Sequence, residues 1–195
     1  MNRNLVNILN LEITKQNIDV NSIFYIGLGK TGSASIFHGF PNRPCFHYHD
    51  YTYFNYVNGA NLKSNQELID LISNIGYMLG FNPVVIECTR NPMDRALSAI
   101  YWNYYNNKNL DHHDLFKMTD EELTYILNNY IKEKPFYKTV NIPKNIKHII
   151  LKLEDKNKWC DILKSYGIND YINKDCNINK DINYIKFKNK IYSII

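Results

Sequence analysis

IFYIGLGKTGSAS, residues 23–35, is the stretch that decides the fold class. It opens with a short, continuously apolar run that ends in Gly27, as expected of a strand buried on both faces of a parallel sheet. A glycine-containing turn follows, and apolar residues then recur at helical spacing up to Phe40, where Pro41 ends the helix. The stretch therefore predicts a buried strand that leads through a tight turn into a helix.

The rest of the chain repeats this alternation. Further apolar runs predict strands at residues 45–49, 83–89 and 147–153. Helical spacing and capping residues predict helices at residues 64–79, 92–105, 119–133 and 157–166. A tyrosine-rich loop is expected after residue 49, and irregular structure over residues 169–190. Alternating strands and helices predict an α/β three-layer sandwich with a central parallel sheet, which binds ligands at the carboxyl ends of its strands.

Length and composition predict one globular domain over residues 1–195. Hydrophobic residues make up 45% and charged residues 22% of the chain, which excludes the disordered and fibrous classes. The net charge of +4 is too small and diffuse to predict a nucleic-acid partner. No run is apolar enough for a signal peptide or a membrane span, so we expect a soluble, cytoplasmic protein. Four cysteines without a CxxC pair predict free thiols.

The turn after the first strand has the composition of a phosphate-binding loop. Backbone N–H groups in such a turn form an anion site, to which Lys30 adds a positive charge. A nucleoside triphosphatase loop would need glycine at the position of Phe24, which weakens that interpretation. The glycines at 27, 29 and 32 match the dinucleotide fingerprint, with Asp50 as the candidate ribose ligand. The glycines are explained equally well by a turn that only connects the strand to the helix and binds no ligand.

A second constellation, RNPMDRALS at residues 90–98, follows the predicted strand at 83–89. Arginine is rare in this lysine-rich chain, so a retained arginine points to a need for its forked guanidinium. Arg90 at the strand end and Ser98 two turns along the next helix could together hold a phosphate. The alternative is that Asn91 and Pro92 only cap the helix and Arg95 pairs with an acid, but this does not account for Arg90.

Together the two constellations resemble the sulfotransferases that use 3′-phosphoadenosine 5′-phosphosulfate (PAPS). Residues 29–35 are similar to their 5′-phosphosulfate loop, and residues 90–98 are similar to their 3′-phosphate motif. The resemblance covers residues 23–105 and, less closely, 147–166. It implies a P-loop sulfotransferase architecture, with PAPS as the co-substrate and no metal.

The resemblance also implies roles for single residues. Lys30 would contact the 5′-phosphate and the oxygen that bridges to sulfur, while Arg90 and Ser98 would hold the 3′-phosphate. Backbone amides and hydroxyls of the loop would complete the phosphate contacts, from Thr31, Gly32, Ser33, Ala34 and Ser35.

A third constellation consists of His47 and His49. Alternate residues of a strand share a face, so both imidazoles would point into one cleft. The other histidines have no spacing that would complete a metal site, and no metal is expected. A neutral imidazole can instead take the proton of an attacking hydroxyl.

The histidine pair is similar to the HxH step of uronyl-type polysaccharide sulfotransferases. This resemblance implies His49 as the base, His47 as its helper and a carbohydrate as the acceptor. Aromatic faces stack on sugars, and four candidates for such a wall follow the pair: Tyr51, Tyr53, Phe54 and Tyr56. Simple packing of these rings, with both histidines as ordinary surface residues, is an equally open interpretation.

The predicted function is transfer of a sulfuryl group from PAPS to an acceptor hydroxyl. One alternative is a binding or interaction domain that keeps the nucleotide site without turnover. Another is a dinucleotide-dependent oxidoreductase, which would not need a site for a 3′-phosphate.

Overall fold

The computed structural model describes residues 18–106, 112–173 and 182–194, and its contacts fall into two compact units. The first, called the sheet unit, comprises the described residues up to Thr89 together with residues 134–173. The second, called the helical unit, comprises the described residues of 90–133 and 182–194. The single sulfotransferase-like domain over residues 1–195 stays a prediction.

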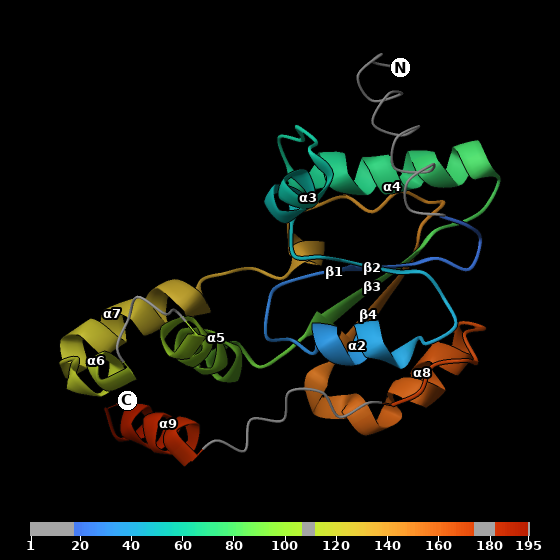
Figure 1. Ribbon diagram of the computed structural model, residues 1–195. Coiled ribbons are helices and arrows are strands. Elements are labelled where there is room, and N and C mark those ends of the chain that lie inside the picture. The colour runs from blue at the N-terminus through green and yellow to red at the C-terminus, as the bar shows by residue number, and fades with distance from the viewer. Residues whose placement is uncertain (1–17, 107–111, 174–181, 195) are drawn as a thin grey trace. The chain divides into compact units, whose positions relative to one another are not determined.

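A four-stranded, all-parallel sheet forms the centre of the sheet unit (Figure 1). Its strands are β1 (Ile23–Ile26), β2 (Cys45–Tyr48), β3 (Val84–Thr89) and β4 (Lys147–Lys152). They lie in the order β2-β1-β3-β4, and Tyr25 of β1 pairs with His47 on one side and Ile86 on the other. The prediction of an α/β fold with a central parallel sheet is confirmed.

The strand order creates a switch point beside β1. After β1 the chain steps outward to β2, and it then crosses back over β1 to form β3 on the other side. The loops that follow β1 and β3 therefore start next to each other at the carboxyl edge of the sheet. Open α/β sheets bind their ligands at this kind of position.

Helices cover both faces of the sheet. Figure 1 shows α3 (Tyr51–Asn58) and α4 (Asn65–Leu79) on one face, and α2 (Ser33–Gly39) and α8 (Trp159–Ser165) on the other. Two short 3₁₀ turns complete the unit, at Phe136–Lys138 and Leu153–Lys158.

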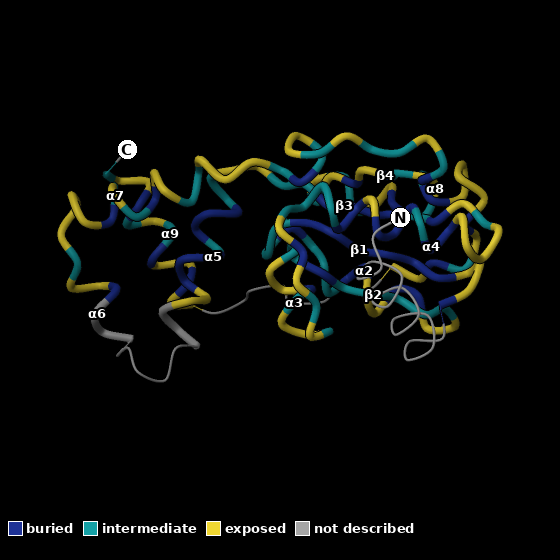
Figure 2. The backbone as a smooth tube through the Cα atoms, turned by 90° about the horizontal axis from the view of Figure 1, so that it is seen from above, coloured by how far each residue is buried: buried dark blue, intermediate teal, exposed yellow. Residues whose placement is uncertain are grey.

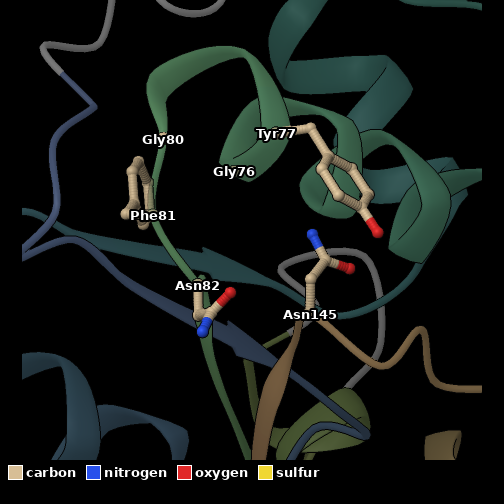
Figure 3. Close-up of a pocket in the computed structure, with 6 residues that line it drawn as sticks. All are labelled: Gly76, Tyr77, Gly80, Phe81, Asn82 and Asn145. Carbon is tan, nitrogen blue, oxygen red and sulfur yellow. The ribbon is translucent and has the colours of Figure 1, made fainter.

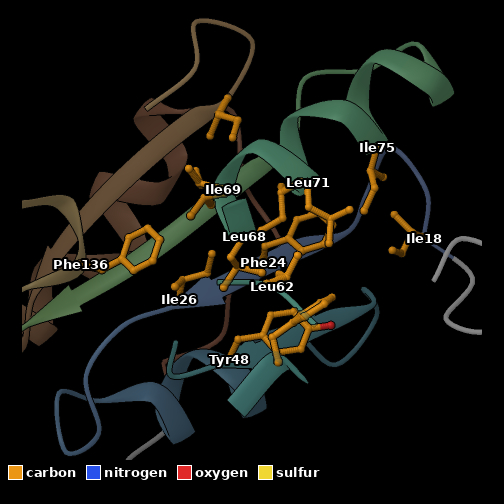
Figure 4. Close-up of a cluster of buried hydrophobic side chains, with 14 residues drawn as sticks. Ile18, Phe24, Ile26, Tyr48, Leu62, Leu68, Ile69, Leu71, Ile75 and Phe136 are labelled. Carbon is orange, nitrogen blue, oxygen red and sulfur yellow. The ribbon is translucent and has the colours of Figure 1, made fainter. Parts of the chain in front are cut away.

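Side chains of β1 alternate between two hydrophobic clusters. Phe24 and Ile26 join the cluster under α4 (Figure 4), whereas Ile23 and Tyr25 join the cluster under α2 and α8. Because both faces are covered, the strand is apolar without interruption, and Figure 2 shows it fully buried.

Capping residues fix the start of the predicted helices. Ser64 accepts a hydrogen bond from the Glu67 N–H at 3.2 Å, and α4 begins at the next residue. Thr119 and Glu122 form the predicted capping box of α7 (Asp120–Ile131). Asn91 Oδ1 accepts from the N–H groups of Met93 and Asp94 at 3.0 and 3.2 Å and so caps α5 (Pro92–Asn106).

The prediction of a tyrosine-rich loop after residue 49 is wrong, because residues 51–58 form α3. Asp50 caps this helix by accepting from the Tyr53 N–H at 2.9 Å, and Gly59 ends it with a φ of 64°. Phe54 is buried in the core rather than available to a sugar, whereas Tyr56 is exposed.

The helical unit contains α5, α6 (His112–Lys117), α7 and α9 (Ile182–Ile194). Irregular structure over residues 169–190 is therefore a wrong prediction for α9, whose Tyr184, Phe187 and Ile191 recur at helical spacing in the core of the unit. Residues 174–181, including Cys176, lie outside the described residues. The other cysteines are free thiols, as predicted: Cys45, Cys88 and Cys160. In the described part of the chain, no helix combines the length and apolarity that crossing a bilayer requires.

Candidate functional site

The loop that follows β1 contains a strained lysine. Lys30 has a φ of 66°, and no other non-glycine residue in the described part of the chain adopts a positive φ. An L-residue with a side chain pays roughly 1–2 kcal/mol for this conformation. Such strain clusters at functional sites, where the surrounding structure imposes it. The predicted key residue of the phosphate loop is therefore also its backbone outlier.

Lys30 is half-buried, and burial lowers its pKa to about 8. At neutral pH most of the amine is still charged. A charge that water solvates only in part interacts more strongly with a bound anion than a fully hydrated one does.

Thr31 anchors the loop from inside. Its hydroxyl donates to the carbonyl oxygen of Leu28 at 2.6 Å and lies 2.8 Å from the Tyr25 hydroxyl. Since Thr31 has one hydroxyl hydrogen, Tyr25 must be the donor in the second contact. Burial also raises the pKa of Tyr25 well above its usual value, which keeps that proton in place. The Thr31 side chain is thus occupied, and only its backbone N–H can serve a ligand.

Gly32 packs against the ring of Trp159. Its φ is 105°, and a Cβ atom there would lie 2.9 Å from the ring of Trp159 and 3.0 Å from Leu153. Trp159 is fully buried, and its Nε1–H donates to the carbonyl oxygen of Lys152 at 2.8 Å. The end of β4 and the start of α8 therefore support the loop, and no residue larger than glycine fits at position 32.

Among the other predicted loop residues, Ser33 and Ala34 are partly exposed in the first turn of α2. Ser35 is only 2% exposed. Of the two serines proposed to contact phosphate, Ser33 is therefore the accessible one.

His49 touches the loop. Its Nδ1 atom lies 3.3 Å from the carbonyl oxygen of Gly27, and a Cβ atom on Gly29 would lie 3.8 Å from its ring. A carbonyl oxygen only accepts hydrogen bonds, so Nδ1 carries the hydrogen in this contact. The Nε2 atom of the neutral ring is then the proton acceptor, as a general base requires.

His47 packs against His49. The two ring centroids are 4.6 Å apart, edge to face, and His47 also contacts Tyr25 at 5.1 Å. Burial, and then the neighbouring His49, lower the pKa of His47 to about 4. Its Nε2 atom is buried without a hydrogen-bond partner among the described residues. His47 is therefore neutral at pH 7 and well suited to accept a hydrogen bond, but it is a weak base.

We expect His47 to make the stability of the protein depend on pH. Between its usual pKa of 6.5 and its folded pKa of about 4, the unfolded chain binds a proton that the folded chain does not. Stability should therefore fall by about 2 kcal/mol as the pH drops from 7 to 4.5. Urea unfolding followed by circular dichroism measures this loss. His47→Gln should remove most of it, and His38→Gln, at an exposed histidine, should leave it unchanged. An equal pH dependence in both variants would contradict the assignment.

Arg90 directly follows the last residue of β3 and belongs with Ser98 to the helical unit, where both are partly exposed. The neighbouring Arg95 has a structural role. It is 4% exposed, pairs with Glu133 at 2.8 Å and donates to the carbonyl oxygen of Tyr130. The acid pairing considered for Arg95 is thus confirmed, and it does not involve Arg90.

The structure brings the loop, Lys30, His47 and His49 together within the sheet unit, and it assigns Arg90 and Ser98 to the helical unit. Sequence reasoning missed Tyr25 and Trp159, which support the loop. A phenol within an otherwise apolar buried strand was the available signal for Tyr25. Trp159 gave none, because its contact with Gly32 joins residues far apart in the chain.

No family model, curated protein or solved structure matches this chain. Within the described residues, no three histidine, cysteine or acidic side chains form a group that could hold a metal ion. Function therefore has to be inferred from the chemistry of the site itself.

Proposed function

We propose that the protein transfers a sulfuryl group from PAPS to the hydroxyl of an acceptor, within a P-loop sulfotransferase architecture. The observation that carries this proposal is that Lys30 and His49 are both connected to the loop that follows β1. Lys30 is held there in a strained conformation, and His49 reaches the same loop through the Gly27 carbonyl. The residue proposed to bind a phosphate and the residue proposed to take a proton are thus connected to the same loop.

The proposed reaction is an in-line displacement at sulfur. The acceptor oxygen attacks sulfur and loses its proton to Nε2 of His49, while the bond between sulfur and the 5′-phosphate oxygen breaks. Negative charge grows on the departing phosphate, where Lys30 and the backbone N–H groups of the loop offset it. The products are a sulfate ester, a protonated histidine and adenosine 3′,5′-bisphosphate.

The nucleotide contacts follow the same assignment. Lys30, Gly32 and Ser33 with the neighbouring amides would hold the 5′-phosphate. The assignment of the 3′-phosphate to Arg90 and Ser98 stays a prediction from the resemblance. A guanidinium suits this second role because its planar fork pairs with two phosphate oxygens at once.

The oxidoreductase alternative has less support. Its candidate ribose ligand, Asp50, already accepts from the Tyr53 N–H and from the Thr52 hydroxyl, at 2.9 and 2.6 Å. A strained lysine inside the loop is also unnecessary for a cradle built from backbone amides alone.

Titration calorimetry with adenosine 3′,5′-bisphosphate tests the nucleotide site. We expect the bisphosphate to bind, and the dinucleotide NAD to fail to bind. At pH 8.5, above the Lys30 pKa of about 8, a bound phosphate should recharge the amine. Binding should then take up as much as about 0.75 proton per site, measured as the dependence of the binding heat on the ionisation enthalpy of the buffer.

Lys30→Met should remove this proton uptake, while Lys63→Met, at an exposed lysine, should keep it. Binding of NAD in preference to the bisphosphate would overturn the proposal. Binding of the bisphosphate without sulfation of any acceptor would identify a nucleotide-binding module instead.

A further inference from the structure

Strand β1 carries one hydroxyl group inside the core. Its other residues, Ile23, Phe24 and Ile26, are apolar, whereas Tyr25 is a phenol that is completely buried. Phenylalanine would fill the same space, and a buried hydroxyl costs free energy unless it is hydrogen-bonded. The Tyr25 hydroxyl makes such a bond with Thr31, at 2.8 Å. The reason for a tyrosine at this position therefore lies in the loop that Thr31 belongs to.

The bond from Tyr25 is the first of two in series. Tyr25 donates to the Thr31 hydroxyl, and Thr31 donates to the carbonyl oxygen of Leu28 at 2.6 Å. The second bond closes a short turn from Leu28 to Thr31, and Lys30, with its φ of 66°, lies inside that turn. The two hydrogen bonds thus hold the segment that contains the strained residue.

The strain at Lys30 and the hydrogen bond from Tyr25 are similar in size. Thr31 is 2% exposed, so its oxygen would lose a hydrogen-bond donor in a buried place if the Tyr25 hydroxyl were absent. The loop could then reduce that cost by moving Thr31 toward water, and Lys30 could leave the left-handed conformation. The conformation of Lys30 therefore depends on the hydroxyl of Tyr25.

The ring of Tyr25 has a separate partner. Tyr25 and His47 are paired in register on neighbouring strands, and their ring centroids lie 5.1 Å apart at an interplanar angle of 73°. Phenylalanine at position 25 would keep this ring contact and would lose the hydrogen bond to Thr31. The role of the hydroxyl can therefore be measured separately from that of the ring.

We propose that Tyr25 is a positioning residue, whose hydroxyl acts through Thr31 to impose the left-handed backbone of Lys30 and so sets where the Lys30 amine lies. Because Tyr25 is completely buried, it acts on the site only through its neighbours. The hold on Lys30 is independent of the function proposed above. Its contribution to sulfuryl transfer rests on that function.

Urea unfolding of four proteins tests the hold on Lys30 without any turnover: the wild type, Tyr25→Phe, Lys30→Gly and the double variant. In the wild type, the loss of the hydroxyl is offset in part by the strain that Lys30 then sheds, whereas glycine at position 30 has no such strain. We therefore expect Tyr25→Phe to raise the unfolding equilibrium constant at least about 5-fold more in the Lys30→Gly protein than in the wild type. An equal rise in both backgrounds would overturn the proposal.

Two other tyrosines provide matched controls for the loss of a hydroxyl. Tyr184 is buried in the core of the helical unit, and its hydroxyl has no hydrogen-bond partner among the described residues. Tyr77 is 70% exposed at a pocket of about 200 Å³ (Figure 3), which lies before the amino end of β3. Tyr184→Phe and Tyr77→Phe should each have the same effect in both backgrounds. A dependence on residue 30 in either control would overturn the assignment to Tyr25.

NMR titration of the Lys30 side chain gives a second readout. Burial holds the pKa of Lys30 at about 8, and water would solvate the amine once the residue leaves its place in the loop. In Tyr25→Phe, the midpoint of the titration should therefore rise by at least about one pH unit, and it should stay unchanged in both control variants. An unchanged midpoint in Tyr25→Phe would overturn the proposal.

Kinetics and bisphosphate binding, measured in parallel, separate this inference from the proposed function. In Tyr25→Phe, kcat and kcat/KM of the proposed transfer should fall together by about 10- to 100-fold, because the amine is misplaced for charge that develops only in the transition state. If the effects on unfolding and on the Lys30 titration appear but the wild type neither binds the bisphosphate nor transfers sulfuryl groups, the sulfotransferase assignment alone is overturned. Transfer at the full rate in Tyr25→Phe, with equal unfolding effects in both backgrounds, would overturn the positioning role alone.

Discussion

Replacing Lys30 with glycine should lower the rate of the proposed sulfuryl transfer by about 10² to 10³, the loss that follows removal of one preorganised group that stabilises transition-state charge. The same change should not destabilise the fold, because glycine adopts the left-handed backbone of residue 30 without the strain that lysine bears. A slower enzyme that is at least as stable as the wild type cannot be explained by misfolding.

The Lys30 experiment compares kcat, kcat/KM and urea unfolding for three proteins. Lys30→Ala should be as slow as Lys30→Gly but less stable, since alanine keeps the strain. Lys63→Ala, at an exposed lysine outside the loop, should match the wild type in rate. Full activity in Lys30→Gly would show that the lysine is not the group that stabilises the leaving phosphate.

Replacing Trp159 with alanine should cost about 3–5 kcal/mol of unfolding free energy, the usual loss for a large aromatic side chain in a core. Trp159 is completely buried, fills the space beneath Gly32 and donates to the Lys152 carbonyl. Its removal should therefore also loosen the loop after β1 and weaken the proposed binding of the bisphosphate.

Urea unfolding and bisphosphate calorimetry together check the Trp159 prediction. The matched control is Trp102→Ala, since Trp102 is 50% exposed and belongs to the helical unit; we expect its loss to stay below about 1 kcal/mol. If Trp159→Ala unfolded at the same urea concentration as Trp102→Ala, the tryptophan could not be the support of the loop.

Local signals were enough to predict much of the fold. The apolar run at residues 23–26 became β1, and the capping residues Ser64 and Thr119 start helices where predicted. These features depend on neighbours within about one helical turn, so the sequence displays them directly. The same holds for the order strand, loop and helix that places Lys30 at the carboxyl end of β1.

Features that depend on distant residues could not be predicted in this way. Tyrosines at residues 51–58 suggested a loop, and only the packing of Phe54 into the core explains why the segment is helical. The apolar residues of α9 are interspersed with lysines and asparagines, and they pack against α5 in the core of the helical unit. Similarly, the orphan nitrogen of His47 reflects burial that α2, α3 and β1 impose jointly.

The partial burial of Lys30 has a further chemical consequence. With a pKa of about 8, roughly a quarter of its side chains are unprotonated at pH 7.5, against about one in a thousand for an ordinary lysine. Only the unprotonated amine is nucleophilic, so acylating and carbonyl reagents would react at this residue far faster than at a solvated lysine. The Lys30 amine, which we propose to bind a phosphate, is thus also a site that a covalent inhibitor could modify.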